Sequence, residues 1–129
     1  MEVHDQVWRL LLDKVDSFEK LEVLMLLSAK PREWTVRAAT EELRLPEPLV
    51  ETAMLDLCAV SLLEKDGQAF RYQPATPELA REAEALTRMY VEDRIRVLNV
   101  LSSAAFDRIR SSAATAFANA FKLRGKPKE

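Results

Sequence analysis

Few side chains in this sequence are of the types that carry out covalent chemistry. His4 is the only histidine and Cys58 the only cysteine among the 129 residues. Hydrolytic triads and thiol–imidazole pairs need a general base held beside the nucleophile, and sequence spacing places neither a serine nor Cys58 beside His4. Glu41 and Glu42 are adjacent in an expected helix and therefore point to different sides of it. These residues predict a protein that is not an enzyme.

Metal and cofactor sites have equally little support in the sequence. A lone histidine and a lone cysteine do not make up the ligand sets that hold zinc. Two glycines leave no glycine-rich loop for a phosphate group. We therefore expect no metal and no cofactor. Cys58 borders the apolar side of its expected helix, which favours a small core side chain, and redox sensing by an exposed thiol is the alternative.

Composition indicates one folded domain, with room for an appended helical arm. Hydrophobic residues make up 48% of the chain and charged residues 31%. No apolar run approaches the roughly 20 residues that a membrane span needs. The single cysteine and the lack of a signal-peptide pattern predict a reduced, cytoplasmic protein without membrane contact. Charge is uneven, because residues 1–64 hold 7 Lys and Arg against 13 Asp and Glu, whereas residues 65–129 hold 12 against 8.

Apolar periodicity predicts a mainly helical chain with one β-hairpin. Asp66-Gly67 is a strong signal for a two-residue hairpin turn. Four helices precede the turn, and a short Pro46-Glu47-Pro48 connection joins the third helix to the fourth. This order is that of a winged helix-turn-helix domain with an additional N-terminal helix. The expected elements are helices at Val3–Val15, Phe18–Ala29, Trp34 to Leu45 and Pro48–Val60, followed by strands at Leu62–Lys65 and Gln68–Tyr72.

The C-terminal part is expected to be a helical arm. Thr76-Pro77-Glu78 has the residues of a helix start, and the helix is predicted to continue to about Leu101. We therefore divide the chain into a winged helix-turn-helix domain, residues 1–75, and an arm, residues 76–129. A line of apolar residues at alternating spacings of four and three predicts a homodimer contact along the arm. This line comprises Leu79, Ala83, Leu86, Tyr90 and Val97, and one acid, Asp93, interrupts it between Tyr90 and Val97.

Two further apolar sets lie in the arm. Val91, Ile95 and Leu98 form a second line that widens its apolar side. The segment Ala105–Phe121 supplies apolar residues that could pack against them. The sequence leaves open whether these helices pack within one chain or between chains.

The run from Trp34 to Pro74 resembles bacterial winged helix-turn-helix transcription regulators, and the likeness extends over about residues 18–74. These proteins have a small capping residue, two short helices with regularly spaced apolar residues, a Leu-Leu-Glu run and a wing. The resemblance implies that the helix at Pro48–Val60 occupies the place of the helix that enters the major groove in DNA-binding members. The matching positions are Thr35, Ala39, Leu43, Val50, Ala53, Met54, Leu57, Leu62 and Leu63.

The helix in that place has the wrong charge for DNA. Its outward side is predicted to carry Glu51, Thr52 and Leu55, with Asp56 at the edge, and Pro48–Val60 contains no Lys or Arg. Carboxylates near phosphates are repelled, whereas an apolar centre with a charged rim is typical of a protein-binding surface. We therefore expect a non-enzymatic regulatory or adaptor protein that binds a protein partner. The simpler interpretation is a solvated surface with one stray leucine.

DNA binding through the wing is the alternative function. Dimerisation would double the number of cations that such a wing presents. The same residues are also interpretable as ordinary surface charges, so we disfavour nucleic acid as the partner. The candidate DNA contacts are Arg37, Arg44, Lys65, Gln68 and Arg71.

Overall fold

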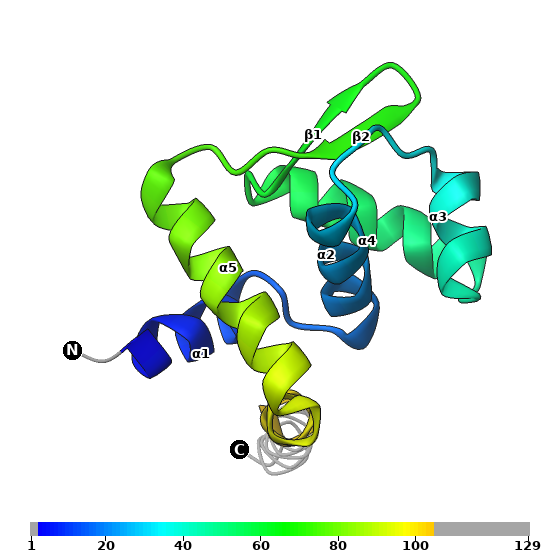
Figure 1. Cartoon of the computed structure of the whole chain (residues 1–129). Helices are drawn as coiled ribbons and strands as arrows, with labels where there is room; N and C mark the ends of the chain where they lie inside the picture. Colours follow the sequence, from blue (N-terminus) through cyan, green and yellow to red (C-terminus); the bar gives the residue numbers. More distant parts are fainter. Residues whose placement is uncertain (1–2, 105–129) are drawn as a thin grey trace, which may run out of the picture.

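The computed structural model describes residues 3–104, and this part is mainly helical with one small antiparallel sheet (Figure 1). A further helical segment covers residues 94–104. The expected four helices and hairpin before residue 75 are present, with ends shifted by a few residues. The elements are α1 (Val3–Asp13), α2 (Phe18–Ala29), α3 (Val36–Leu43), α4 (Glu47–Ala59), β1 (Leu63–Asp66), β2 (Ala69–Tyr72) and α5 (Pro77–Glu92).

Short polar side chains fix where three of the helices begin. Each hydroxyl accepts a hydrogen bond from the backbone amide three residues later, at 3.1 Å, and so satisfies an amide that has no partner within the helix. Helix α4 instead follows Pro46 and carries Pro48 in its first turn, where the missing amide hydrogen is no loss. The capping hydroxyls are those of Ser17 at α2, Thr35 at α3 and Thr76 at α5.

The hairpin turn lies one residue later than the sequence predicts. Strands β1 and β2 pair from Leu63 opposite Tyr72 to Asp66 opposite Ala69, which leaves Gly67 and Gln68 as the turn. Gly67 has a φ of +65°, and Asp66 does not adopt a positive φ. A type II′ turn needs a positive φ at its first central residue alone, and glycine is the residue that adopts this conformation readily. The prediction of Asp66-Gly67 as the central pair is therefore wrong by one residue.

The hairpin is attached to the start of α3 through Trp34. The Trp34 amide donates to the Phe70 carbonyl at 2.8 Å, and the Phe70 amide donates back to the Trp34 carbonyl at 2.7 Å. The Trp34 indole nitrogen donates to the Lys30 carbonyl at 3.0 Å. Both aromatic side chains are buried. This bridge fixes β2, close to the turn of the hairpin, against the end of α2 and the start of α3.

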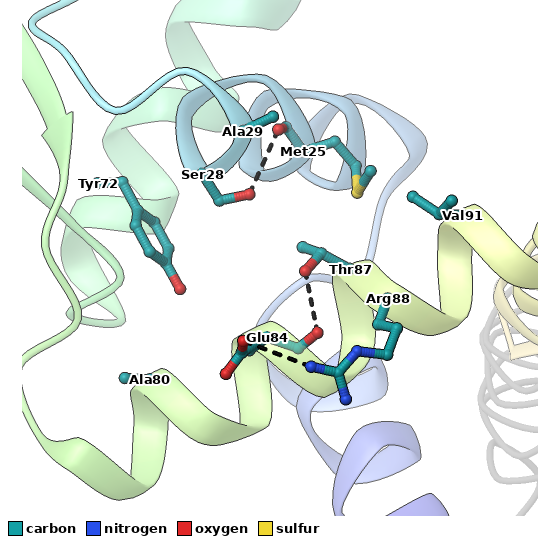
Figure 2. A pocket seen from close by; sticks show the side chains of 9 residues that line it. All are labelled: Met25, Ser28, Ala29, Tyr72, Ala80, Glu84, Thr87, Arg88 and Val91. Carbon is teal, nitrogen blue, oxygen red and sulfur yellow. Dashed lines mark hydrogen bonds and ion pairs between the residues drawn. The ribbon is translucent and has the colours of Figure 1, made fainter.

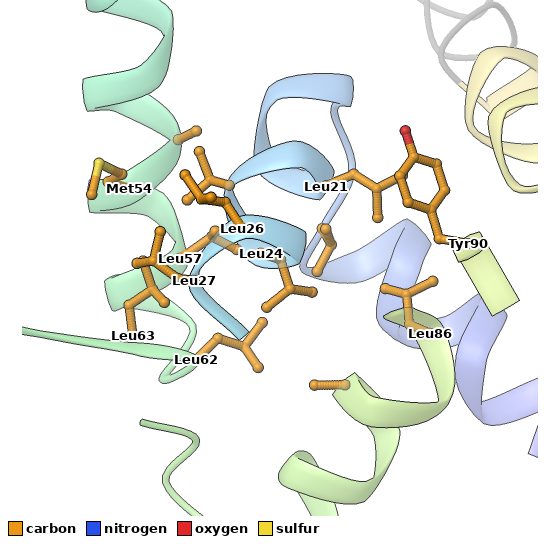
Figure 3. Packing of buried hydrophobic residues seen from close by; sticks show 14 of the residues in the cluster. Leu21, Leu24, Leu26, Leu27, Met54, Leu57, Leu62, Leu63, Leu86 and Tyr90 are labelled. Atoms are coloured by element: carbon orange, nitrogen blue, oxygen red, sulfur yellow. The ribbon is translucent and has the colours of Figure 1, made fainter. Parts of the chain in front are cut away.

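One hydrophobic core connects α1 with α5. Helix α2 lies at its centre, where Leu21 and Leu24 are buried together with Met54 and Leu57 of α4 and Leu86 of α5 (Figure 3). Helix α5 packs against α1, and α2 packs against α4. The arm therefore contributes to the same core as the residues before position 76.

The expected continuous helix from Thr76 to Leu101 is wrong. Helix α5 ends at Glu92, and Asp93 adopts an extended φ of −146° before the helical segment 94–104 begins. The Asp93 carboxylate accepts a hydrogen bond from the Arg96 amide at 3.4 Å. Aspartate is a preferred N-cap residue and a poor residue for a helix interior. The apolar spacing continues across position 93 although the helix does not.

The line assigned to a homodimer contact faces the interior of the chain. Helix α5 crosses α1 (Figure 1), and its apolar side packs there. All five residues of the line have exposed fractions of 7% or less. Their contact is therefore made within one protomer, and this line is not available to a second copy in this fold. The residues are Leu79, Ala83, Leu86, Tyr90 and Val97. The expected contribution of Ala105–Phe121 lies outside the described residues.

Tyr90 joins α5 to α2 through a polar contact at the edge of the core. Its hydroxyl donates to Glu22 Oε2 at 2.5 Å, and Arg94 Nη2 lies 3.5 Å from the same oxygen. The Arg94 guanidinium also lies 4.9 Å from the centre of the Tyr90 ring. Burial, followed by the hydrogen bond to Glu22, raises the pKa of Tyr90 above its ordinary value. The folded state therefore favours the protonated phenol.

Tyr90→Phe is expected to lower the free energy of unfolding at neutral pH by about 1.5–3 kcal/mol, since it removes a hydrogen bond to a charged group. The raised pKa adds a pH dependence. The contribution of Tyr90 is complete below the unfolded-state pKa of about 10 and declines above it, because the unfolded chain loses the phenol proton first. Urea unfolding at neutral and alkaline pH measures both effects.

The matched control is Tyr72→Phe, because burial followed by the charge of Glu84 also raises the pKa of Tyr72. No hydrogen bond of the Tyr72 hydroxyl is found among residues 3–104. We expect Tyr72→Phe to cost less at neutral pH. Equal losses from both variants would contradict the role given to the Glu22 contact.

Candidate protein-docking surface

Helix α4 buries one side and exposes the other. Leu49 and Leu55 are 45% and 44% exposed. At 100° per residue they lie about 60° to either side of Thr52, so two leucines flank the outermost part of the helix. We call Leu49, Glu51, Thr52, Leu55 and Asp56 the α4 surface. On the opposite side the predicted inward residues are buried, namely Val50, Ala53, Met54 and Leu57.

The charges of α4 are all negative. The helix contains Glu47, Glu51 and Asp56 and no Lys or Arg. Within residues 3–104, neither glutamate forms an ion pair. Asp56 Oδ2 lies 3.5 Å from Lys20 Nζ, and this ammonium also pairs with Asp16 at 2.7 Å, so its single charge is shared between two carboxylates. Two solvated carboxylates remain beside the leucines.

A groove of about 370 Å³ runs between the α4 surface and the start of α2. Leu49, Thr52 and Asp56 form one wall, and Lys20 with Asp16 forms part of the other. Lys20 Nζ donates to Asp16 Oδ1 at 2.7 Å. Burial lowers the pKa of Lys20, but the hydrogen bond and charge of Asp16 and the charge of Asp56 outweigh it, so the net shift is upward. Lys20 therefore remains charged and holds both carboxylates in place.

The candidate DNA contacts on the hairpin are partly neutralised. Arg71 Nη2 lies 2.7 Å from Glu64 Oε1, and Arg71 Nη1 lies 3.8 Å from Glu33 Oε2. Lys65 is exposed, and its ammonium lies 5.7 Å from the centre of the Phe70 ring. Gln68 is exposed in the turn. The arginine of the wing thus faces two carboxylates of its own chain, which weakens its attraction for phosphate.

Of the two candidate DNA contacts at α3, one forms an ion pair with a neighbouring glutamate and the other does not. Arg37 Nε lies 3.5 Å from Glu41 Oε2, one helical turn away. Arg44 is exposed and ends α3 in the left-handed conformation, with φ 57° and ψ 42°. It forms no ion pair with any residue from 3 to 104. Of the four predicted cations, Arg44 and Lys65 are therefore the two without an ion-pair partner in the described part of the chain.

A second hollow of about 480 Å³ lies between α2, the end of β2 and α5 (Figure 2). Its walls include Met25, Ala29 and Tyr72, and the Tyr72 hydroxyl points toward α5. The charged residues in its lining are Glu84 and Arg88, which lie 3.4 Å apart and balance each other. This volume is in the range of small-ligand pockets. Because the charges of the lining cancel, they do not indicate which class of ligand would bind. The α4 surface is therefore the more specific candidate for a binding site.

Cys58, the only cysteine of the sequence, lies at the edge of the core. Cys58 is half-buried, packs against the core and has its thiol pKa raised, mainly by burial. A raised pKa disfavours the reactive thiolate. Among residues 3–104, no three His, Cys, Asp or Glu side chains are placed to hold a metal ion.

Sequence reasoning identified Leu55 but missed Leu49. The signal was present, because Leu49 precedes the inward Val50 by one residue and so turns about 100° away from it. The Asp16–Lys20–Asp56 contact was also missed. Asp16 and Asp56 are 40 positions apart in the sequence. Apolar periodicity within one helix cannot predict a contact between side chains of separate elements.

Comparisons with known proteins add no family assignment. No protein-family model, no curated protein and no solved structure matches this chain. None of the helices in the described part of the chain combines the length and apolar character needed to cross a bilayer. The function must therefore be argued from the α4 surface and its surroundings.

Proposed function

We propose that this chain is a non-enzymatic regulatory or adaptor protein that binds a protein partner through the α4 surface. The observation that carries the proposal is the composition of that surface, where Leu49 and Leu55 are exposed beside Glu51 on a helix without Lys or Arg. Exposed leucines beside solvated carboxylates suit a partner that presents an apolar side chain flanked by cations.

The scaffold that we propose is a winged helix-turn-helix domain. Three features support it: the close packing of α3 on α4, the tight connection after Arg44, and the hairpin that follows α4. The bridge between Trp34 and Phe70 adds a short third line of backbone pairing beside the hairpin. In this scaffold α4 takes the place of the DNA-reading helix, so the scaffold is used here for a different partner.

DNA binding is the second candidate, and Arg44 with Lys65 is the observation that favours it. Both side chains are exposed and lack an ion-pair partner within residues 3–104. Against it, a duplex reaching both residues would also approach the carboxylates of α4, and phosphate binding depends on neutralising the backbone charge. Fluorescence anisotropy with random duplex DNA at low salt distinguishes the candidates. We expect no saturable binding.

The direct test of the protein-docking proposal is the double variant Leu49→Glu with Leu55→Glu. We expect it to bind the partner about 100-fold more weakly, because the loss of two central apolar contacts at about 1.4 kcal/mol each corresponds to a hundredfold change in the dissociation constant. Wild type and variant are immobilised in turn, captured proteins are quantified, and the dissociation constant of the enriched partner is measured by calorimetry.

Arg81→Glu is the matched control. It changes net charge by the same amount as the double variant and lies on an exposed position of α5, away from α4. Both variants should keep the wild-type melting temperature, since their side chains are exposed or half-exposed. If the double variant captured the same partner with unchanged affinity while random DNA bound tightly, the DNA candidate would replace the proposal.

A further inference from the structure

The hollow between α2, the end of β2 and α5 has the features of a small-molecule site. We call it the α2–α5 hollow, and its volume of about 480 Å³ lies within the range of ligand pockets, which is about 300–1,000 Å³. Side chains from all three elements border this one space (Figure 2), and every lining residue belongs to the described part of the chain. A compact molecule could therefore touch α2, β2 and α5 at the same time.

Apolar groups of the α2–α5 hollow are exposed where a ligand would cover them. Val91 is 72% exposed, the highest value among the large apolar side chains of the described residues. It lies at the end of the hollow away from Tyr72 (Figure 2), and Met25 and Ala80 add further apolar lining. Removal of apolar surface from water is the main favourable contribution to most binding. The lining therefore favours a ligand with an apolar body.

Two aliphatic hydroxyl groups in the lining can accept a hydrogen bond from a ligand. The Ser28 hydroxyl donates to the Met25 carbonyl at 3.3 Å. The Thr87 hydroxyl donates to the Glu84 carbonyl at 3.0 Å. Each hydroxyl has only one hydrogen, and that hydrogen is used within its own helix. What remains on both oxygens is the capacity to accept.

The Tyr72 hydroxyl is the group that can donate. Its ring extends from the end of β2 toward α5 (Figure 2), and no hydrogen bond of its hydroxyl is found among residues 3–104. Burial, followed by the charge of Glu84, raises the pKa of Tyr72, so the phenol keeps its proton at neutral pH. A ligand hydroxyl group suits this lining, because it accepts one hydrogen bond and donates another.

The charged residues of the lining do not favour a ligand of either sign. Arg88 Nη2 and Glu84 Oε2 lie 3.4 Å apart and pair with each other. A charged ligand would lose water in the hollow and would find no unpaired counter-ion among the described lining residues, which opposes its binding. An uncharged molecule does not have this cost. Selection therefore depends on the apolar walls and the hydroxyl groups.

We propose that the α2–α5 hollow binds a small uncharged molecule with an aromatic or alicyclic body and one hydroxyl group. The body lies against the apolar lining between Ala80 and Val91. The hydroxyl accepts a hydrogen bond from Tyr72 Oη and donates one to Ser28 Oγ or Thr87 Oγ1. This inference goes beyond the proposed function, because the hollow shares no residue with the α4 surface.

The probe for this proposal is 1-naphthol, an uncharged fused-ring molecule with a single hydroxyl group. Calorimetry with the full chain should give a dissociation constant below about 1 mM. In a nuclear magnetic resonance titration, amide signals of the hollow should shift and those of the α4 surface should not. The analogue 1-naphthoate carries a charged carboxylate on the same rings and should bind at least about tenfold more weakly. Weaker binding of 1-naphthol than 1 mM, shifts away from the hollow, or equal binding of 1-naphthoate would overturn the proposal.

Two variants test the roles given to the lining. Tyr72→Phe removes the donating hydroxyl and keeps the ring, so 1-naphthol should bind about fivefold more weakly, as expected for the loss of one neutral hydrogen bond. Ala80→Leu fills part of the hollow with a side chain that suits a helix and should weaken binding at least about tenfold. Unchanged affinity in either folded variant would overturn the proposal, and circular dichroism checks that each variant folds.

Two controls separate this site from other parts of the molecule. Tyr90→Phe removes a tyrosine hydroxyl that is bonded to Glu22 outside the hollow, so it should leave the affinity for 1-naphthol unchanged. The α4 variant Leu49→Glu with Leu55→Glu should also bind 1-naphthol like wild type. Failure of the ligand site and failure of the protein-docking surface are therefore distinguishable results. A loss of 1-naphthol binding in the α4 variant would place the probe on the α4 surface and overturn the proposal.

Discussion

Trp34→Ala is expected to lower the free energy of unfolding by about 3–5 kcal/mol. The side chain is 1% exposed, and its indole nitrogen donates to the Lys30 carbonyl at 3.0 Å. The substitution removes the largest fully buried side chain and leaves a cavity between α2 and the hairpin. It also removes one of the two hydrogen bonds that the Lys30 carbonyl accepts; the other, from the Arg32 amide at 2.9 Å, remains. Urea denaturation followed by circular dichroism measures the loss.

Trp34→Phe separates packing from hydrogen bonding at the same position. It keeps most of the apolar volume, loses the bond to Lys30 and should cost clearly less than the alanine variant. The backbone bridge to Phe70 persists in both, because it joins main-chain atoms alone. A cost below about 1 kcal/mol for Trp34→Ala would show that the hairpin is not anchored as described.

Leu86→Ala is expected to lower the free energy of unfolding by about 2–5 kcal/mol. Leu86 is fully buried where α5 joins the core. If this residue acts within one protomer, the loss relative to wild type should be the same at low and high protein concentration. If it acted between copies, the loss would grow with concentration, because association is linked to stability by mass action. Chemical denaturation at several concentrations distinguishes these cases.

The matched control for Leu86→Ala is Leu55→Ala, the same substitution at a position that is 44% exposed. It should change stability by no more than about 0.5 kcal/mol. Equal losses from the two variants would contradict the burial of the arm line within the protomer.

Local chemistry explains why the helix starts were predictable. Ser17, Thr35 and Thr76 each act as the cap that their position in sequence indicates, since a capping hydroxyl needs only the amides of the following turn. The hairpin was predictable for the same reason. Its turn is shifted by one residue because only Gly67, and not Asp66, adopts a positive φ. Each of these signals involves residues that are close together along the chain.

The arm was predicted less well because periodicity does not identify the surface that a helix meets. The spacing of Leu79 and Leu86 is the same whether they contact a second copy or α1 of their own chain. The break at Asp93 had a local signal, but the continuing apolar spacing outweighed it in the sequence-based interpretation.

The candidate site shows the same division between local and long-range information. The exposure of Leu55 followed from helical geometry. The pairing of Arg71 with Glu33 and of Asp56 with Lys20 did not, because each pair comes from separate elements. The sequence thus predicted the acidic helix, whereas the structure was needed to show how few of the surrounding cations remain unbalanced.

The hairpin offers a practical position for a reporter group. Strand β2 is held by the bridge between Trp34 and Phe70, whereas an added Cβ at Gly67 would meet no atom within 4 Å. A fluorophore attached at the neighbouring exposed Gln68 would therefore sit on a rigid support without displacing packed atoms. Its anisotropy would follow binding of a protein partner in real time, while the α4 surface stays chemically untouched.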